Sequence, residues 1–247
     1  MSDIFTFEMN EQKPDFKYSK IKQYENYIRD ELVKPVFTKY RIELEEKGIA
    51  ATPIDEKMMK RFFFDKLDGR QYLISSLDIL GDSETVITEF NKSKIENGNR
   101  NNTGECYMRV YGVLSAVYIQ TQAIKTLSEI FKVSSNDVVK KQIEDSGIMF
   151  LRHIISAHPL NFSTDLIKRE SFQLSRFSLT DWGDLQVRNH HGKFEDYKIF
   201  DLLKEYEQLA QLALHQIAIK VIDMLYRTNT ERIPALEERL NKIKDAD

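Results

Sequence analysis

An arginine and a histidine six residues apart are the side chains of this sequence best suited to chemistry. They open and close the segment RHIISAH at residues 152–158, which follows a long apolar stretch and is itself followed by Pro159. A permanent cation and a side chain that titrates near neutral pH are what phosphodiester cleavage without a metal requires. The pattern therefore indicates an Arg152 that binds an anion and a His158 that transfers a proton. The alternative is an ordinary core histidine and an ordinary surface arginine.

The position of this pair on a helix sets a geometric condition. In an α-helix, Arg152 and His158 point about 120° apart and are separated by about 9 Å of rise. Pro159 disfavours the helical conformation at His158, so the helix should end there. A long arginine side chain and a frayed helix end could still bring both groups to one phosphate. Alternatively, two copies of the chain meet across a two-fold axis and share their pairs. We favour the second arrangement and predict a homodimer whose interface contains or adjoins residues 152–158.

The composition indicates a soluble, helix-rich, cytoplasmic protein. Of the 247 residues, 41% are hydrophobic and 30% are charged, and there are only 9 Gly and 5 Pro. These values are typical of a globular chain that favours helix. No run approaches the roughly 18 apolar residues of a membrane span, and the first residues lack the order of a signal peptide. We therefore expect no association with a membrane.

Helical periodicity extends over most of the chain and places the motif within a bundle. Apolar residues recur every three or four positions in seven segments. These segments are residues 16–47, 55–67, 70–96, 104–131, 135–158, 199–227 and 230–244. The sequence therefore predicts an all-α protein.

Proline, glycine and short polar residues predict where these helices divide and end. Pro35 should kink or divide the first segment, and Gly48 should end it. Gly81 and Asp82 are a possible break in the third segment, and residues 82–84 (DSE) are most simply a helix cap. We place an N-terminal helical region at 1–97, a polar linker at 98–104 and a helical bundle at 105–247.

One stretch of the bundle alternates with the period of a β-strand. Phe172 and Leu174 alternate with polar residues, as do Leu185 and Val187, and a turn-forming segment separates the two runs. The sequence predicts a β-hairpin near 172–190, with a short third strand at 194–199.

Residues 104–162 resemble the HEPN superfamily. A tyrosine-rich amphipathic helix is followed by a short turn and a second helix that ends FLRHIISAHPLNF. The mark of that superfamily is Arg-x(4–6)-His on a helix of a four-helix bundle, with a polar residue after the arginine, the place that His153 occupies. The closing residues 157–159 (AHP) resemble those of a bacterial branch of the superfamily whose role is unknown. The resemblance covers about 104–228 and implies a HEPN-like antiparallel bundle.

The resemblance also implies an activity. Many members are metal-independent endoribonucleases and toxins that act as dimers, which suggests a role in stress response or phage defence; others are catalytically silent. In the implied mechanism the RNA 2′-hydroxyl attacks the adjacent phosphate while His158 acts as general base or acid. Arg152 stabilises the phosphoryl charge, and His153 hydrogen-bonds the phosphate or orients a partner. The alternative is a non-catalytic helical module that dimerises or holds a partner protein or small ligand.

The net charge of −3 gives the chain no overall attraction for RNA, so binding would need a local basic patch. Four basic residues bracket the predicted hairpin and are the candidates, with an ordinary solvated surface as the alternative. They are Lys168, Arg169, Arg176 and Arg188. We expect no metal and no cofactor, because the acidic residues show no ligand spacing and the adjacent His190 and His191 diverge. The single Cys106 excludes an intramolecular disulfide.

Overall fold

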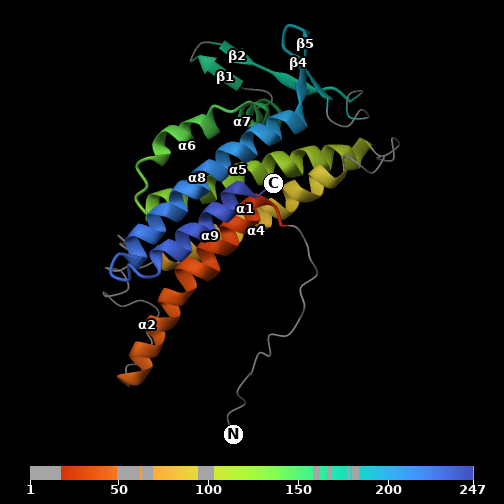
Figure 1. Cartoon of the computed structure of the whole chain (residues 1–247). Helices are drawn as coiled ribbons and strands as arrows, with labels where there is room; N and C mark the ends of the chain where they lie inside the picture. The colour runs from red at the N-terminus through yellow and green to blue at the C-terminus, as the bar shows by residue number, and fades with distance from the viewer. Residues whose placement is uncertain are drawn as a thin grey trace.

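A computed structural model gives the arrangement of the chain. It describes residues 18–48, 62, 69–93, 103–157, 162–165, 168–176, 179 and 184–246. The described chain is mostly helical, with long helices side by side and short strands gathered at one end (Figure 1). This confirms the helical class predicted from periodicity. Within the described residues, no helix is both long enough and apolar enough to cross a membrane.

The first helical path runs through Pro35 without a break. It consists of α1 (Lys20–Asn26), the π-helical turn η1 (Tyr27–Val33) and α2 (Lys34–Glu46). Pro35 lies in the first turn of α2, directly after the π-helical turn η1, and the helical path continues through it. The segment is therefore not divided there, and the alternative of a kink stays a prediction. Gly48 adopts φ +64° just beyond α2, a conformation that glycine accepts readily, which confirms the predicted end.

Helix α4 (Gly69–Ser93) passes uninterrupted through the predicted break at Gly81 and Asp82. A Cβ on Gly81 would lie 2.9 Å from Nζ of Lys22. The glycine thus lies where side chains of α1 contact α4, and it does not end the helix. Residues 82–84 accordingly lie in mid-helix, and their interpretation as a cap is wrong.

Helix α5 (Thr103–Ile130) lies beside α4 along much of its length (Figure 1). Its start agrees with the predicted end of the linker, although residues 94–102 lie outside the described residues. The predicted helix at 55–67 also lies outside them, apart from the buried Phe62, whose ring stacks on Phe37 of α2.

The helix predicted over 135–158 is divided into three pieces. They are α6 (Asn136–Glu144), α7 (Gly147–Arg152) and the π-helical turn η2 (His153–Ala157). The break falls at Ser146, whose backbone is extended and whose hydroxyl donates to the carbonyl of Ile143 at 2.7 Å. Gly147 begins α7 so close to α8 that a Cβ there would lie 2.6 Å from a methyl carbon of Leu202. Tight packing on α8 thus accompanies the break.

The predicted hairpin is present and is part of a three-stranded antiparallel sheet. Its strands are β3 (Phe172–Leu174), β4 (Asp184–Asn189) and β5 (Phe194–Lys198), in the order β3-β4-β5. Leu174 pairs with Val187, and Leu185 pairs with Tyr197. A second ladder, β1 (Phe162–Asp165) with β2 (Lys168–Glu170), was not predicted because it carries no clear alternation.

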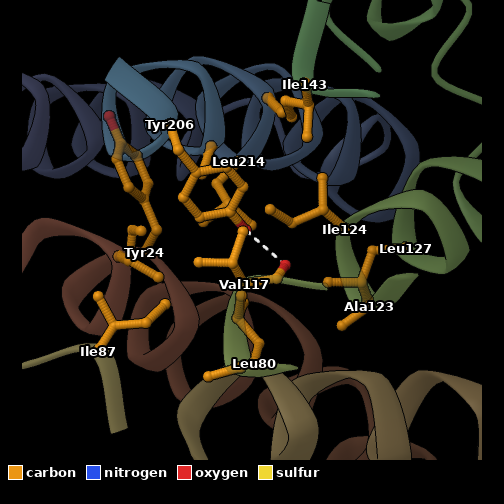
Figure 2. Packing of buried hydrophobic residues seen from close by; sticks show 14 of the residues in the cluster. Tyr24, Leu80, Ile87, Val117, Ala123, Ile124, Leu127, Ile143, Tyr206 and Leu214 are labelled. Carbon is orange, nitrogen blue, oxygen red and sulfur yellow. Dashed lines mark hydrogen bonds between the residues drawn. The ribbon is translucent and has the colours of Figure 1, made fainter. Parts of the chain in front are cut away.

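The last two helices follow the prediction closely. Helix α8 (Ile199–Tyr226) runs the length of the bundle, and α9 (Ile233–Asp245) has Pro234 in its first turn. One hydrophobic core joins residues from α1 to α9, so the N-terminal region packs on the predicted bundle. Figure 2 shows the middle of this core, where Leu80 of α4 and Val117 of α5 lie on one side and Tyr206 and Leu214 of α8 on the other. Each such side chain contributes about 1.5–3 kcal/mol through burial.

Candidate functional site

Arg152 is the last residue of α7, at the point where the helix widens into η2. Its guanidinium carbon lies 4.0 Å from the centre of the Tyr118 ring on α5, a cation–π contact. Its Nη1 lies 3.4 Å from Nδ1 of His153. Because an arginine is always a donor, that nitrogen of His153 is the acceptor in this contact. Buried Ile154 and Ile155 anchor the turn that follows.

The positive charge of Arg152 is not neutralised within the described part of the chain. No carboxylate of the described residues forms an ion pair with it; its partners there are an aromatic ring and an imidazole. The side chain is half-buried, so the ring holds it in place while part of it stays accessible. Such a fixed and uncompensated cation is suited to an anionic ligand.

His158 lies outside the described residues, so the expected pair of Arg152 and His158 stays a prediction. The structure does, however, differ from the straight α-helix on which the predicted directions of Arg152 and His158 were based. The 120° divergence applied to a straight α-helix, and residues 153–157 form a π-helical turn with i→i+5 hydrogen bonds. Short π-helical turns are common at functional sites in proteins.

The candidate RNA-binding residues lie at the end of the bundle that carries the strands. Strand β3 packs against η2, so the three-stranded sheet adjoins the turn after Arg152. Arg188 is exposed on β4 with its guanidinium 6.0 Å from the ring of Phe194, and Arg176 is exposed after β3. Lys168 and Arg169 belong to β2.

The other candidate ligands do not form a metal centre in the described residues. The ring centres of His190 and His191 lie 3.7 Å apart at an exposed turn, so the expected divergence of these two side chains is wrong. Cys106 is buried in α5. Within the described ranges, no group of three or more His, Cys, Asp or Glu could hold a metal ion.

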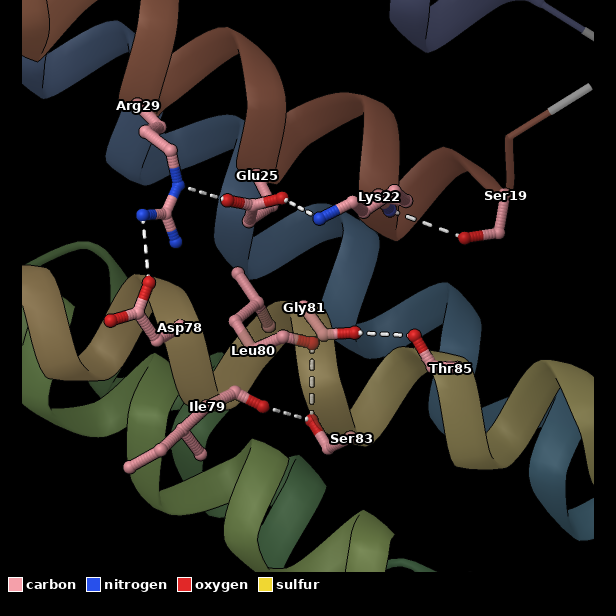
Figure 3. Close-up of polar contacts among 10 residues, drawn as sticks. All are labelled: Ser19, Lys22, Glu25, Arg29, Asp78, Ile79, Leu80, Gly81, Ser83 and Thr85. Carbon is pink, nitrogen blue, oxygen red and sulfur yellow. Dashed lines mark hydrogen bonds and ion pairs between the residues drawn. The ribbon is translucent and has the colours of Figure 1, made fainter. Parts of the chain in front are cut away.

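A buried charged cluster between α1 and α4 was missed by the sequence interpretation. Glu25 is fully buried and forms ion pairs with Lys22 and Arg29 on its own helical path. Arg29 continues across to Asp78 of α4, with Nη1 2.8 Å from a carboxylate oxygen (Figure 3). Buried ions are stable only when paired in this way. The detectable signal was a glutamate on the apolar stripe that includes Ile21 and Ile28.

A second buried carboxylate, Glu84, is held mainly by neutral groups. The amide of Gln120 donates to it at 3.0 Å, and the Tyr206 hydroxyl donates to the same amide's oxygen at 2.9 Å. Burial raises the pKa of Glu84, and hydrogen bonds from Ser19, Gln120 and Thr88 act in the opposite direction. Here too the signal was an acidic residue on a stripe of leucines.

The negative charge of Glu84 acts on a third carboxylate, Glu207 of α8. Burial and the nearby Glu84 raise its pKa, while a hydrogen bond from Asn91, 3.0 Å long, lowers it. The two carboxylates thus form a coupled pair inside the bundle. Because hydrogen bonds to the surrounding amides and hydroxyls already hold them, we interpret them as determinants of packing.

Comparison of the chain with family models, with curated proteins and with solved structures found no match. The argument for function therefore rests on the motif at 152–158 and on the surroundings of Arg152.

Proposed function

We propose that this protein is a metal-independent endoribonuclease of the HEPN type. The observation that carries the proposal is the state of Arg152, which is held on Tyr118 beside His153 with no neutralising carboxylate among the described residues. A phosphodiester would supply the missing negative charge. The proposal includes a HEPN-like bundle, a homodimer in the cytoplasm and a role in stress response or phage defence.

In the proposed reaction, the RNA 2′-hydroxyl attacks the neighbouring phosphate. His158 acts either as the general base that accepts the proton of that hydroxyl or as the general acid that donates a proton to the leaving 5′-oxygen. Arg152 stabilises the negative charge that develops on the phosphoryl oxygens. His153 lies beside Arg152 and orients its guanidinium or binds the phosphate. The basic residues in and beside the strands contact the RNA backbone; they are Lys168, Arg169, Arg176 and Arg188.

The test is cleavage of total RNA in EDTA by the wild type and by Arg152→Ala, Arg152→Lys and His158→Ala. Each variant should lose activity by about 10²–10⁴-fold, because each removes a group that acts in the transition state. Lysine should fail to replace Arg152, since it lacks the forked donors that match phosphate oxygens. The products should carry 2′,3′-cyclic phosphate ends. Arg41→Ala, at an exposed site on α2, is the control and should cleave normally.

Two outcomes would overturn the nuclease. One is cleavage that survives Arg152→Ala and His158→Ala; the other is cleavage that EDTA abolishes. If the wild type cuts no RNA and His158→Ala lowers the melting temperature sharply, His158 is a core residue.

The second candidate function is a non-catalytic helical interaction module. The observation that favours it is a row of exposed apolar side chains on α4 and α5, among them Ile79, Val86, Met108 and Ile119. A protein that cuts no RNA but forms a stable oligomer through these helices would support this function.

A further inference from the structure

The three-stranded sheet β3-β4-β5 has one buried face and one exposed face. Side chains alternate along each strand, so every second residue shares a face. The inner face carries the buried apolar residues of β3 and β4; they are Phe172, Leu174, Leu185 and Val187. On the outer face, the register places Gln173 of β3, Arg188 of β4 and Phe194 of β5 in one row across the sheet, and all three are exposed. We call these three residues the outer-face row.

The ring and the cation of this row are in contact and open to solvent. Phe194 is 56% exposed, and the guanidinium carbon of Arg188 lies 6.0 Å from the centre of its ring. The same guanidinium lies over the turn between β4 and β5, where its Nη2 is 3.4 Å from the position of a Cβ on Gly192. No carboxylate of the described residues forms an ion pair with Arg188. The row therefore presents an aromatic face and an uncompensated positive charge side by side.

Hydrogen bonds fix the shape of the turn that supports the row. The side-chain oxygen of Asn189 accepts from the backbone N–H of His191 at 3.0 Å and from that of Lys193 at 3.1 Å. Gly192 has φ +77°, which glycine accepts readily, and its N–H donates to the carbonyl of Asn189 at 2.9 Å. The surface is thus organised before a ligand binds, which lowers the entropic cost of binding.

The charge near the turn suits an anionic ligand. Residues 185–194 (LQVRNHHGKF) include the exposed cations Arg188 and Lys193 and no acidic residue. Two further rings, those of His190 and His191, are exposed in the turn with their centres 3.7 Å apart. A polyanion can therefore approach this end of the sheet without repulsion from the turn or from the row.

Acidic residues limit this surface on the side away from the turn. Asp196 follows Phe194 by two residues and lies on the same face, and beyond it Asp184 lies opposite Lys198. Glu195 belongs to the inner face, because it falls between Phe194 and Asp196. The basic and aromatic part of the outer face is thus confined to its end at the turn.

We propose that the outer-face row binds unpaired bases of single-stranded RNA by stacking. An exposed aromatic ring on a sheet stacks on the face of a base, and a guanidinium beside it stacks as well or attracts the phosphates. The amide of Gln173 can both donate to and accept from a base edge. Bases in a duplex are covered by their neighbours on both faces, so the ligand is a single strand.

The choice of RNA as the ligand rests on the proposed nuclease, because the motif at 152–158 is what indicates a phosphodiester substrate. Strand β3 links the two regions, since it carries Gln173 and packs against η2, the turn after Arg152. The row holds the RNA strand, and the Arg152 site acts on a phosphate farther along it. The inference thus adds a base contact by Phe194 to the backbone contact proposed for Arg188.

The first test measures binding separately from cleavage. The probe is a fluorescein-labelled 2′-O-methyl RNA of about 12 nucleotides and mixed sequence, because stacking tolerates every base. It has no free 2′-hydroxyl, so the proposed reaction cannot cut it, and fluorescence anisotropy gives its Kd. Phe194→Leu keeps an apolar side chain without the ring and should weaken binding by about 5–100-fold. Phe194→Tyr keeps the ring and should bind as the wild type does.

Tyr72→Leu is the matched control for the loss of an exposed ring. Tyr72 is 54% exposed on α4, outside the sheet, so its replacement should leave the Kd unchanged. The melting temperatures of all variants are compared with that of the wild type. A ring that only stabilised the hairpin would lower the melting temperature of Phe194→Leu and leave its Kd for the probe unchanged, which would overturn the inference.

The second test separates the ring from the cation by the dependence of Kd on salt. Arg188→Gln should weaken binding and should also reduce the slope of log Kd against log salt, because one cation fewer displaces counterions from the RNA. Phe194→Leu should weaken binding with no change in that slope, because stacking releases no counterions. The same slope for Arg188→Gln as for the wild type would contradict a contact between Arg188 and the RNA.

Three results would overturn the inference without deciding the nuclease. They are a wild type that does not bind the single-stranded probe, a wild type that binds the probe equally well when it is annealed to its complement, and equal affinities of Phe194→Leu and the wild type. Cleavage of total RNA tests the nuclease separately. Binding of the probe that depends on Phe194, with no cleavage of RNA, would support the outer-face row as a binding site and remove the nuclease.

Discussion

Two arginines of this protein, Arg29 and Arg152, are held in opposite ways. Arg29 lies between the buried Glu25 and Asp78, so its charge is neutralised by carboxylates of α1 and α4. Arg152 rests on the ring of Tyr118 beside His153, and no carboxylate of the described residues pairs with it. The first arginine joins two helices, and the second has no carboxylate partner among the described residues. A cation that is neutralised within the fold indicates a structural role, and a fixed cation without such a partner is suited to the binding role that we propose for Arg152.

The largest effect should come from removing the carboxylate at the centre of the charged cluster. Glu25→Gln leaves Lys22 and Arg29 without their shared partner, and we expect a loss of about 2–4 kcal/mol in the free energy of unfolding. Urea unfolding at pH 7 measures it. Glu45→Gln is the control, because Glu45 pairs with Arg41 at the surface and should cost below about 0.5 kcal/mol. Equal losses in the two variants would show that the buried ion pairs of Glu25 stabilise the protein no more than the surface pair of Glu45 does.

The next largest loss of stability should come from Arg29→Met, and the same substitution at Arg152 provides the comparison. Arg29→Met leaves Glu25 with one cation instead of two, and we expect a loss of about 2–3 kcal/mol. Arg152→Met removes only the contact with Tyr118 and its neighbour, and we expect a loss below about 1 kcal/mol. Thermal unfolding of both variants under one condition measures the difference. If Arg152→Met is as destabilising as Arg29→Met, Arg152 is structural and the functional proposal loses its main support.

Glu84 should behave oppositely to Glu25, because its hydrogen-bond partners are neutral groups, whereas those of Glu25 are cations. Burial raises its pKa, so the folded state holds its proton more tightly than the unfolded chain does. The stability from this group is full below the ordinary glutamate pKa and is lost as the pH rises through the raised pKa. Glu84→Gln imitates the protonated form and should stabilise the protein by about 1 kcal/mol at pH 7.

The pH dependence of the free energy of unfolding is the control for Glu84→Gln. The difference in the free energy of unfolding between Glu84→Gln and the wild type should be near zero at pH 4 and should grow toward pH 8. The pKa of Glu207 should also fall toward its ordinary value, since the charge of Glu84 contributes to raising it. A variant that is destabilised at every pH would show that the ionised carboxylate is required for packing.

The smallest loss of stability should come from substituting Asp78, at the solvent-exposed end of the charged cluster. Asp78 is 55% exposed, and its pair with Arg29 is in contact with solvent. Asp78→Asn should cost below about 1 kcal/mol, and the cost should shrink in 0.5 M salt, because screening weakens exposed pairs. Unfolding at two salt concentrations measures it. A large, salt-independent loss would place Asp78 in the buried part of the cluster.

Local pattern was sufficient to predict several elements. The long periodic stripes predicted α5, α8 and α9, since an amphipathic helix needs only a repeating apolar face. Alternation predicted β3, β4 and β5, and Gly48 marked a helix end because only its own φ angle is involved. For the candidate site, the sequence supplied Arg152 and His153 as neighbours at the end of a helix.

Contacts between distant segments decided the rest. Helix α4 continues through Gly81, where side chains of α1 lie against it, and the helix breaks at Ser146, where α7 packs closely against α8. Nothing near Arg152 in the chain predicts that Tyr118 supports it, because that contact joins two helices. A residue type and its spacing determine which helix forms and which face is apolar. Which charges are neutralised, and which apolar surface stays uncovered, depends on neighbours that are remote in the sequence.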